Sequence, residues 1–329
     1  MITSDADVST EGPTVGAAID AGSNSVHLVV GSIDPSGVGV TPIVDESELL
    51  GLGDAVDATG EIDRDGEQRL IAAVRRYLAV ARAYGASHVT LLGTEPFRRA
   101  TNGATVAHAV EDATGLRLHV LRHEDEGLLT LFGVTGGAPV HERMLVVDIG
   151  GGSSEFVLAS PDGRSVAGAV ATGASRLTKQ AVRHDPPTAD EIAGLRESAT
   201  RLVDAAGGSS SGAPRADRAV LVGGTATNLV KLSPVASAEM RLERSALPEL
   251  YDVIGTMPAD AIAERYLVNR RRAGMLAAGA ALVEAFLDRF EVAVADVSRV
   301  SLREGAILVR ERSGEAWLER LADGGLRAS

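Results

Sequence analysis

Three short turns rich in glycine and small hydroxyl residues could bind phosphate, at residues 22–25, 150–154 and 223–227. Each follows an apolar stretch. Glycine lets the backbone approach a ligand closely and present its N–H groups together, while serine, threonine and asparagine add neutral donors. One such turn alone is best explained as a tight hairpin turn. Three turns in the same context, two of them closely preceded by an aspartate, predict a phosphate-binding cleft.

Those two aspartates, Asp20 and Asp148, end apolar strands, where a carboxylate is costly unless it is paired, hydrogen-bonded or bound to a metal. A bare carboxylate would also repel phosphate. A divalent cation is the natural bridge, and oxygen ligands suit Mg²⁺ or Mn²⁺. Glu155, at the mouth of the second turn, could join that site. The alternative, that each aspartate only caps its turn through backbone N–H groups, stays open.

A third acidic feature is the stretch HEDEG at residues 123–127. Acids are favoured at a helix N-terminus, which accounts for Glu124 and Asp125. One carboxylate of this stretch could instead face the cleft and orient a water molecule. The histidines show no spacing typical of metal ligands, so we interpret them as surface or core residues.

Alternating strands and helices must position these groups. Apolar strands are predicted at 15–20, 26–31, 88–94 and 144–150, and helical spacing of apolar residues predicts a helix over 70–84. The pattern IDAGSNSVHLVV near the start recurs as VDIGGGSSEFVL from residue 147. Such a repeat predicts an internal duplication of one α/β domain, with mixed sheets flanked by helices.

Composition narrows the class of protein. The chain has 329 residues, a formal net charge of −13, 45% hydrophobic and 23% charged residues, and no cysteine. The charge argues against nucleic acid as a partner. No apolar run reaches the roughly 18 residues of a membrane span, and the acidic N-terminus does not resemble a secretory signal. We therefore expect a cytoplasmic protein that binds neither membrane nor nucleic acid.

Seven stretches together resemble the exopolyphosphatase / guanosine pentaphosphate phosphohydrolase (Ppx/GppA) family, in its short two-domain form. They occur in the family's order and cover residues 15 to about 312: AAIDAGSNSVHLVV (17–30), GTEPFRRATNG (93–103), HEDEGLLTLFGV (123–134), VVDIGGGSSEFVL (146–158), TGASRLT (172–178), VGGTATNL (222–229) and SLREG (301–305).

The resemblance implies two ribonuclease-H-like domains of the actin, sugar kinase and chaperone ATPase superfamily, with five-stranded mixed sheets and the active site in the cleft between them. On this basis we expect a disordered tail at residues 1–14, a first domain at 15–134, a second at 135–312 and a polar tail at 313–329. A homodimer fits the resemblance, although the sequence shows no interface.

The resemblance also implies the chemistry, which is hydrolysis of a terminal phosphoanhydride. The family's catalytic glutamate falls on Glu126, which would activate water, and its arginine on Arg98, which would bind phosphate. Asp148 and Glu155 match the metal-associated acids, with Asp20 added from the strand argument and Mg²⁺ or Mn²⁺ as cofactor. The expected phosphate ligands are Ser23, Asn24, Ser25, Gly150, Gly151, Gly152, Ser153, Gly224 and Thr225.

Several positions depart from the family pattern. Glu95-Pro96 stands where Ser-Ala is usual before Arg98, and Arg99 replaces an acid. Glu95 adds negative charge beside the site. With a net charge of −13 as well, we expect short polyphosphate, guanosine pentaphosphate or guanosine tetraphosphate as ligand rather than a long phosphate chain.

Two other functions remain as alternatives. One is a paralogue that binds a phosphorylated ligand without hydrolysing it, which the changed residues around Arg98 motivate. The other is an ATP-dependent kinase of the same superfamily, which is weaker because Glu126 matches the hydrolase pattern and no acceptor site is evident.

Overall fold

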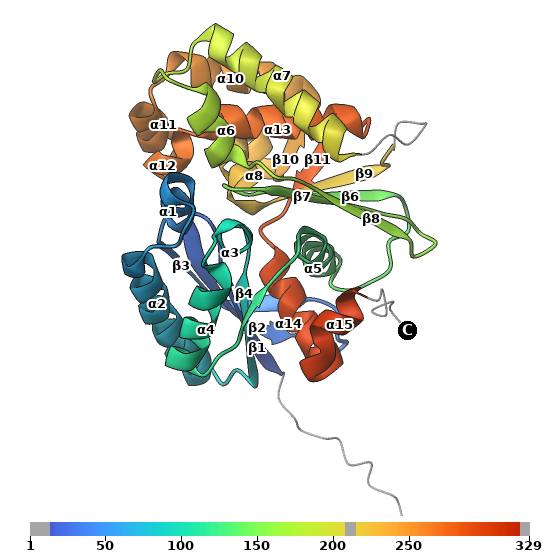
Figure 1. Cartoon of the computed structure of the whole chain (residues 1–329). Coiled ribbons are helices and arrows are strands. Elements are labelled where there is room, and N and C mark those ends of the chain that lie inside the picture. The colour runs from blue at the N-terminus through green and yellow to red at the C-terminus, as the bar shows by residue number, and fades with distance from the viewer. Residues whose placement is uncertain (1–13, 208–214, 323–329) are drawn as a thin grey trace, which may run out of the picture.

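The chain forms two lobes, one above the other in Figure 1. The computed structural model describes residues 14–207 and 215–322. Of the tail expected at residues 1–14, all but Thr14 lies outside the described residues. Each lobe is built on one mixed β-sheet, which confirms the predicted α/β fold class.

The first sheet has five strands in the order β3-β2-β1-β4-β5. Strands β1, β2 and β3 are antiparallel neighbours, and β4 and β5 continue parallel to β1. Their bounds are β1 (Val15–Ala21), β2 (Ser25–Ile33), β3 (Val40–Leu49), β4 (His88–Gly93) and β5 (Leu118–Val120).

The second sheet repeats this arrangement. Read as β8-β7-β6-β9-β11, it matches the first strand for strand, with β6, β7 and β8 antiparallel neighbours and β9 and β11 parallel to β6. The predicted duplication therefore extends beyond the repeated hairpin. The bounds are β6 (Met144–Ile149), β7 (Ser154–Ala159), β8 (Ser165–Val170), β9 (Arg218–Val222), β10 (Arg241–Glu243) and β11 (Val294–Val297).

The prediction of five strands in this second sheet was wrong by one. The additional strand, β10, pairs antiparallel with β11 at the edge of the sheet. It is three residues long and lies in a mainly helical region, so no period-two pattern could develop in the sequence.

Fifteen α-helices are described in residues 14–207 and 215–322, besides short 3₁₀ turns. They are α1 (Leu52–Thr59), α2 (Arg64–Ala83), α3 (Glu95–Arg99), α4 (Gly103–Thr114), α5 (His123–Thr135), α6 (Ala174–Ala181), α7 (Ala189–Ala206), α8 (Gly223–Leu229), α9 (Pro234–Glu239), α10 (Leu247–Thr256), α11 (Ala259–Tyr266), α12 (Arg270–Ala273), α13 (Leu276–Arg289), α14 (Leu302–Ser313) and α15 (Trp317–Ala322).

Alternation along the strands distributes the core of the first lobe over both faces of its sheet. Ala17 and Ile19 of β1 pack with α2 and α4, whereas Ala18 between them packs with Leu129 of α5 and Ile307 of α14. Both faces are thus covered by helices, as a sheet with parallel strands requires.

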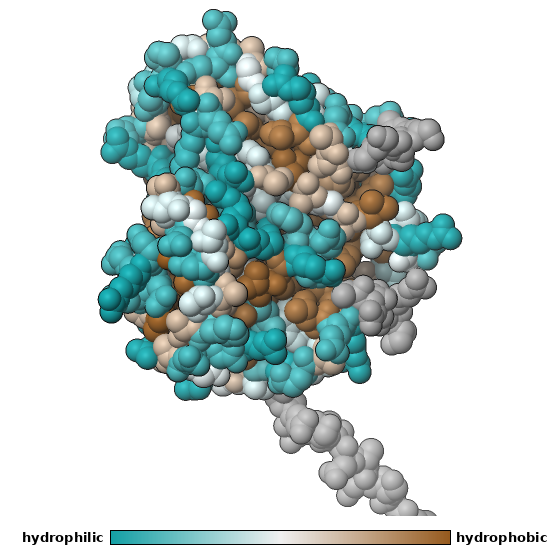
Figure 2. Space-filling model, in the orientation of Figure 1, coloured by the Kyte–Doolittle hydropathy of each residue, from teal (hydrophilic) through white to brown (hydrophobic). Residues whose placement is uncertain are grey.

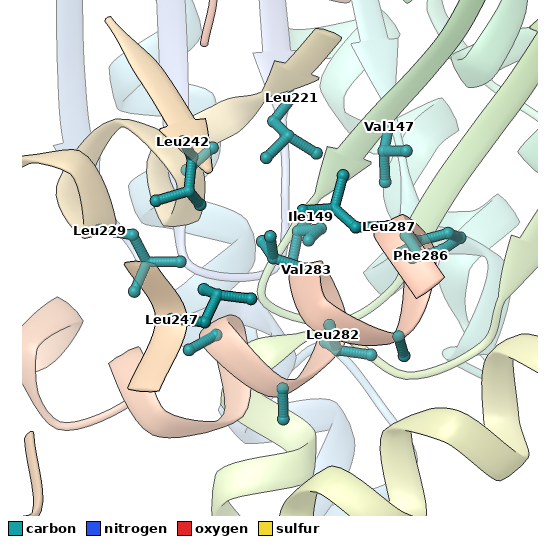
Figure 3. Packing of buried hydrophobic residues seen from close by; sticks show 14 of the residues in the cluster. Val147, Ile149, Leu221, Leu229, Leu242, Leu247, Leu282, Val283, Phe286 and Leu287 are labelled. Carbon is teal, nitrogen blue, oxygen red and sulfur yellow. The ribbon is translucent and has the colours of Figure 1, made fainter. Parts of the chain in front are cut away.

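The second sheet is also covered on both faces. On one face, Val147, Ile149 and Leu221 point toward helix α13, which contributes Leu282 and Phe286 (Figure 3). Across the sheet, a smaller cluster joins β6 and β9 to α5. Helix α5 therefore serves both lobes, since it packs on the second sheet and contributes to the core beneath the first.

Helices α5 and α14 cross at two glycines. A Cβ on Gly133 would clash with the carbonyl oxygen of Ser301, and one on Gly305 with that of Leu129. Close approach at these positions lets the two helices fill the space between the sheets. The catalytic candidate on α5 is thus held by contacts from both lobes.

Helix α14 does not follow the predicted domain boundaries. The sequence prediction placed it with the second half, but it packs against β1, β2 and β4 of the first sheet. We propose that the first lobe comprises residues 14–134 together with the segment from 301 onward. That segment includes α15, where a polar tail was expected, and Trp317 at the start of α15 is 1% exposed.

Hydrophilic side chains cover most of the face in Figure 2, and hydrophobic ones are exposed in scattered patches. Among the described helices, none has the length and apolar character to cross a membrane.

Candidate active site

A cleft of about 540 Å³ lies between the two lobes. Every predicted site residue except Arg98 lines it. From the first lobe these are Asp20, Ser23, Asn24, Ser25 and Glu126, and from the second Asp148, Gly150, Gly151, Gly152, Ser153, Glu155, Gly224 and Thr225.

The strands bring the acids of the second lobe together. Asp148 on β6 is paired directly opposite Glu155 on β7, so both side chains leave the same face of the sheet. Gly223, the residue that follows the neighbouring strand β9, has φ of 87° and lies against Oδ1 of Asp148. A side chain at residue 223 would be strained and would collide with this carboxylate, so the turn requires glycine.

Four carboxylates gather on the floor of the cleft. Glu126 and Glu155 are buried, at 5% and 4% exposure, and Asp20 and Asp148 are half-buried. Burial, with the negative charge of Glu155, raises the pKa of Glu126 well above its ordinary value. Burial likewise raises the pKa of Asp148 to about 7 and that of Asp20 to about 6. These acids would release their protons more readily beside a positive charge.

Arg98 supplies positive charge to one end of this cluster. Its Nη1 pairs with Glu126 and donates to the carbonyl oxygen of Leu121 at 2.8 Å, and its Nη2 lies 3.6 Å from Glu155 Oε1. The guanidinium thus holds the candidate catalytic carboxylate in place. In this conformation it does not line the cleft, and its role as a direct phosphate ligand stays a prediction.

His123 belongs to the same end of the cluster and was missed by the sequence interpretation. Its Nδ1 lies 2.8 Å from Oε1 of Glu155 and 3.0 Å from Nη2 of Arg98. Its position three residues before Glu126 places both on one helix face, which is the signal that could have found it.

The side chains of the first predicted phosphate turn are engaged with neighbouring residues. The Ser23 hydroxyl donates to Glu95 at 2.5 Å, and Asn24 Oδ1 accepts from Arg271 at 3.2 Å. The Ser25 hydroxyl lies 2.6 Å from Nε2 of His27. Whether these residues contact phosphate stays a prediction.

Two arginines that the sequence interpretation did not select, Arg272 and Arg303, also line the cleft. The side chain of Arg303 is 12% exposed, and its Nη1 is buried with no hydrogen-bond partner among the described residues; the nearest acid, Asp45, is 3.7 Å away. Burial and the like charge of Arg303 lower the pKa of Arg272, which lies directly over Gly224. Two half-buried cations that line the same cleft form a site for an anion.

The donor set suits a divalent cation. Oδ1 of Asp20 is buried and, among the described residues, has no hydrogen-bond partner, although it faces other carboxylates. His123, Glu126 and Glu155 could also hold an ion, because each offers one possible ligand atom and these three atoms lie within 4.8 Å of one another. The carboxylates cluster without enough positively charged side chains to balance their charge. Such a set of oxygen ligands fits a hard metal ion.

The raised pKa values of Asp20 and Asp148 predict a pH-dependent stability. Their folded-state pKa values lie above the ordinary 3.8, so the folded protein holds these two protons more tightly than the unfolded chain does. The stabilisation that this gives is fully present below about pH 4 and is lost as the pH rises through about 6 to 7. Burial lowers the pKa of His27 from 6.5, so His27 makes stability rise with pH. This opposite effect occurs only below pH 6.5 and does not affect the range above it. In metal-free protein, the melting temperature should fall by roughly 1 to 2 °C between pH 6.5 and about 8, and Mg²⁺ should restore it. A melting temperature that stays level in EDTA would contradict this prediction.

Comparison with known proteins agrees with the geometry of the cleft. Residues 29–313 match the Ppx/GppA phosphatase family. The chain belongs to this family. Ppx/GppA membership makes it a phosphohydrolase, as the sequence predicted.

Two mycobacterial relatives match over most of their length. Exopolyphosphatase 1 of Mycobacterium leprae (strain TN) is 31% identical over 311 residues, covering 91% of this chain and 89% of the relative. Exopolyphosphatase 1 of Mycobacterium tuberculosis (strain ATCC 25618 / H37Rv) is 30% identical over 318 residues, covering 92% and 90%.

Solved Ppx/GppA structures share the two-lobed fold. A structure of the Aquifex aeolicus PPX-GPPA enzyme is 26% identical, with a TM-score of 0.75, and covers 90% of this chain and 99% of that one. A second crystal structure of the Aquifex aeolicus family member is 25% identical, with a TM-score of 0.76, and covers 92% and 99%.

Proposed function

We propose that this enzyme removes the terminal phosphate from inorganic polyphosphate, with short chains favoured, or from guanosine pentaphosphate. One observation carries the proposal: four carboxylates lie on the floor of a cleft that also holds the half-buried cations Arg272 and Arg303. The acids supply a base and metal ligands, and the cations supply counter-charges for the rest of a phosphate chain. The names of the mycobacterial relatives, exopolyphosphatases, support polyphosphate as substrate.

Glu126 would accept the proton of the attacking water. Burial raises the pKa of Glu126, which makes its carboxylate, once ionised, a stronger base than that of an ordinary glutamate. Water attacks the terminal phosphorus, the bond from that phosphorus to the bridging oxygen breaks, and the shortened chain leaves with that oxygen. Arg98 keeps the Glu126 carboxylate oriented throughout, because it is paired with it.

Asp20, Asp148 and Glu155 would hold Mg²⁺ or Mn²⁺, with His123 beside Glu155. Such an ion, when bound, neutralises phosphate charge and aligns the reacting oxygens. Without it, the same acids would repel the substrate.

Arg303 should dominate binding of the phosphates that follow the terminal one, because its Nη1 is buried and has no hydrogen-bond partner among the described residues. We expect Arg303→Met to raise KM for tripolyphosphate by about 10- to 100-fold, the loss of one charged hydrogen bond, with a smaller change in kcat. Steady-state kinetics would measure this. Arg320→Met, an exposed arginine on α15, is the matched control. Equal KM values for the two variants would remove Arg303 from the phosphate site.

Phosphate release with Mg²⁺ or Mn²⁺ from short polyphosphate, long polyphosphate, guanosine pentaphosphate and ATP tests the function. Release from short polyphosphate or guanosine pentaphosphate supports it, and the ranking of the substrates identifies the preferred one. No release from any of the four by folded protein would contradict the proposal and favour a phospho-ligand binding protein. ADP formation that requires an added acceptor would instead indicate a kinase.

A further inference from the structure

The first predicted phosphate turn, residues 22–25, has three polar side chains, and two of them are bonded to charged groups. The Ser23 hydroxyl donates its proton to a buried glutamate at 2.5 Å, and the Asn24 side-chain oxygen accepts from an arginine at 3.2 Å. The Ser25 hydroxyl instead lies 2.6 Å from Nε2 of His27. Of the two serine hydroxyls in this turn, that of Ser25 thus faces a ring nitrogen, which can either donate or accept.

The backbone of Ser25 is held firmly at the edge of the cleft. Ser25 begins β2, is 7% exposed, and is paired in register with Leu49 of β3. Its carbonyl oxygen accepts from the backbone N–H of Gly22 at 3.0 Å, which closes the turn. Both Ser25 and His27 line the cleft. Because the backbone is fixed, the neighbouring ring decides in which direction the hydroxyl proton points.

His27 is the middle member of a row of three polar residues across the first sheet. Its register partner on β1 is Asp20, and its partner on β3 is Ser47. Residues directly opposite each other on neighbouring strands share a face, and all three line the cleft. Ser25 shares that face as well, since it lies two residues before His27 on the same strand. The ring therefore reaches the Ser25 hydroxyl on the face that borders the cleft.

The direction of this hydrogen bond decides whether Ser25 can bind an anion. A serine hydroxyl has one proton, and an ionised phosphate oxygen only accepts. If Nε2 of His27 takes that proton, Ser25 presents only lone pairs to the cleft, and these repel phosphate. If Nε2 carries a proton and donates it, the Ser25 proton is free to point at phosphate. The hydrogen bonds around an imidazole select which nitrogen is protonated, so phosphate in the cleft favours the second arrangement.

We propose that His27 is a positioning residue, which donates from Nε2 to the Ser25 oxygen and so directs the Ser25 proton toward a phosphate oxygen of the substrate. The inference rests on the proposed function, because it concerns binding of the same substrate. It adds to the prediction that Ser25 binds phosphate, since it assigns the direction of the hydroxyl and the group that sets it. In this arrangement His27 acts through Ser25 and not on the phosphate directly.

Substitution of His27 by leucine and by glutamine tests the proposal. His27→Leu cannot donate, so KM for tripolyphosphate should rise about five- to tenfold, the loss of one hydrogen bond, with kcat within about twofold. The amide nitrogen in His27→Gln is as many bonds from Cβ as Nε2 is, so KM should return to within about twofold of wild type. If Nε2 accepts from Ser25 instead, His27→Leu would release the Ser25 proton. KM would then stay level or fall, which would overturn the proposal.

His88→Leu is the matched control. His88 is a half-buried histidine on β4 of the same sheet and does not line the cleft, so KM should keep its wild-type value. Equal rises in KM for His27→Leu and His88→Leu would mean that any such change loosens the sheet, and would overturn the role of His27. If His27→Leu does not fold, His27→Asn replaces it, because this shorter amide reaches only the position of Nδ1. Equal KM values for His27→Asn and His27→Gln would also overturn the proposal.

A double-mutant cycle tests whether His27 acts through Ser25. Ser25→Ala alone should raise KM for tripolyphosphate by about tenfold, because it removes the donor itself. In the Ser25→Ala background, His27→Leu should add less than about a twofold change, since the group that it directs is gone. Two independent effects that multiply would mean that His27 contacts phosphate itself, and would overturn the proposal.

Binding distinguishes failure of this inference from failure of the proposed function. Calorimetry in the Glu126→Gln background, at one Mg²⁺ concentration, measures the affinity for tripolyphosphate without turnover. An affinity about five- to tenfold weaker in His27→Leu and restored in His27→Gln supports the inference even if wild-type protein releases no phosphate. Equal affinities overturn it even if hydrolysis is observed. Titration with Mg²⁺ alone should give the same affinity in all these variants. A parallel loss of Mg²⁺ affinity in His27→Leu would place its effect at Asp20 and overturn the inference.

Discussion

Glu126→Gln is expected to lower kcat for phosphate release by about 10²- to 10⁴-fold, the range for losing a general base. The amide fills the same volume and still accepts from Arg98, so KM and the melting temperature should change little. Of the four carboxylates, Glu126 is the one that α5 presents and that Arg98 pairs with directly. This expectation follows from the raised pKa of Glu126 and its place in the cleft.

Glu124→Gln is the matched control for that variant. Glu124 lies two residues earlier on the same helix, is exposed, and does not line the cleft. It should keep wild-type kcat. Equal rates for the two variants would mean that charge on this helix, rather than a base at residue 126, matters for the reaction.

Asp148→Asn is expected to have two effects of opposite sign. Activity with Mg²⁺ should fall by at least about 10²-fold, because a metal ligand is weakened. Metal-free protein should become more stable by about 2 kcal/mol near pH 8, because a carboxylate whose pKa burial raises to about 7 no longer has to be charged there. The fall in melting temperature between pH 6.5 and about 8 should shrink with it.

Thermal unfolding in EDTA and in Mg²⁺ measures both effects, together with steady-state rates. Asp162→Asn provides a control, since Asp162 is an exposed aspartate in a turn of the same lobe. If Asp148→Asn destabilises metal-free protein while Mg²⁺ still raises its melting temperature as in wild type, the assignment of Asp148 to the metal site is wrong.

Much of the fold was predictable from the sequence because it is encoded locally. The repeated strand–turn–strand pattern around Asp20 and Asp148 indicated a duplication, and both sheets share the same strand order. Strand β3 was missed because it is an edge strand whose side chains are mostly exposed, so it lacks an apolar pattern. The position of α14 was missed for another reason, since its return to the first sheet depends on tertiary contacts that no local pattern reports.

The site residues also divide into those that a local pattern reveals and those that only tertiary contacts bring together. Residues on the turns and strand ends were found because glycine and acid patterns are local. Arg272 and Arg303 come from segments far along the chain, and only folding brings them to the cleft. The hydrogen bond from Ser23 to Glu95 likewise joins residues far apart in the sequence, which shows only that an acid stands three residues before Arg98.

The central claim is that water attacks the terminal phosphorus of the chain with Glu126 as base. Hydrolysis of polyphosphate in ¹⁸O-labelled water with Mg²⁺, followed by mass spectrometry of both products, tests this directly. We predict one solvent oxygen in the released orthophosphate and none in the shortened chain, with release lost in Glu126→Gln. Label in the shortened chain, or undiminished release by Glu126→Gln, would contradict it.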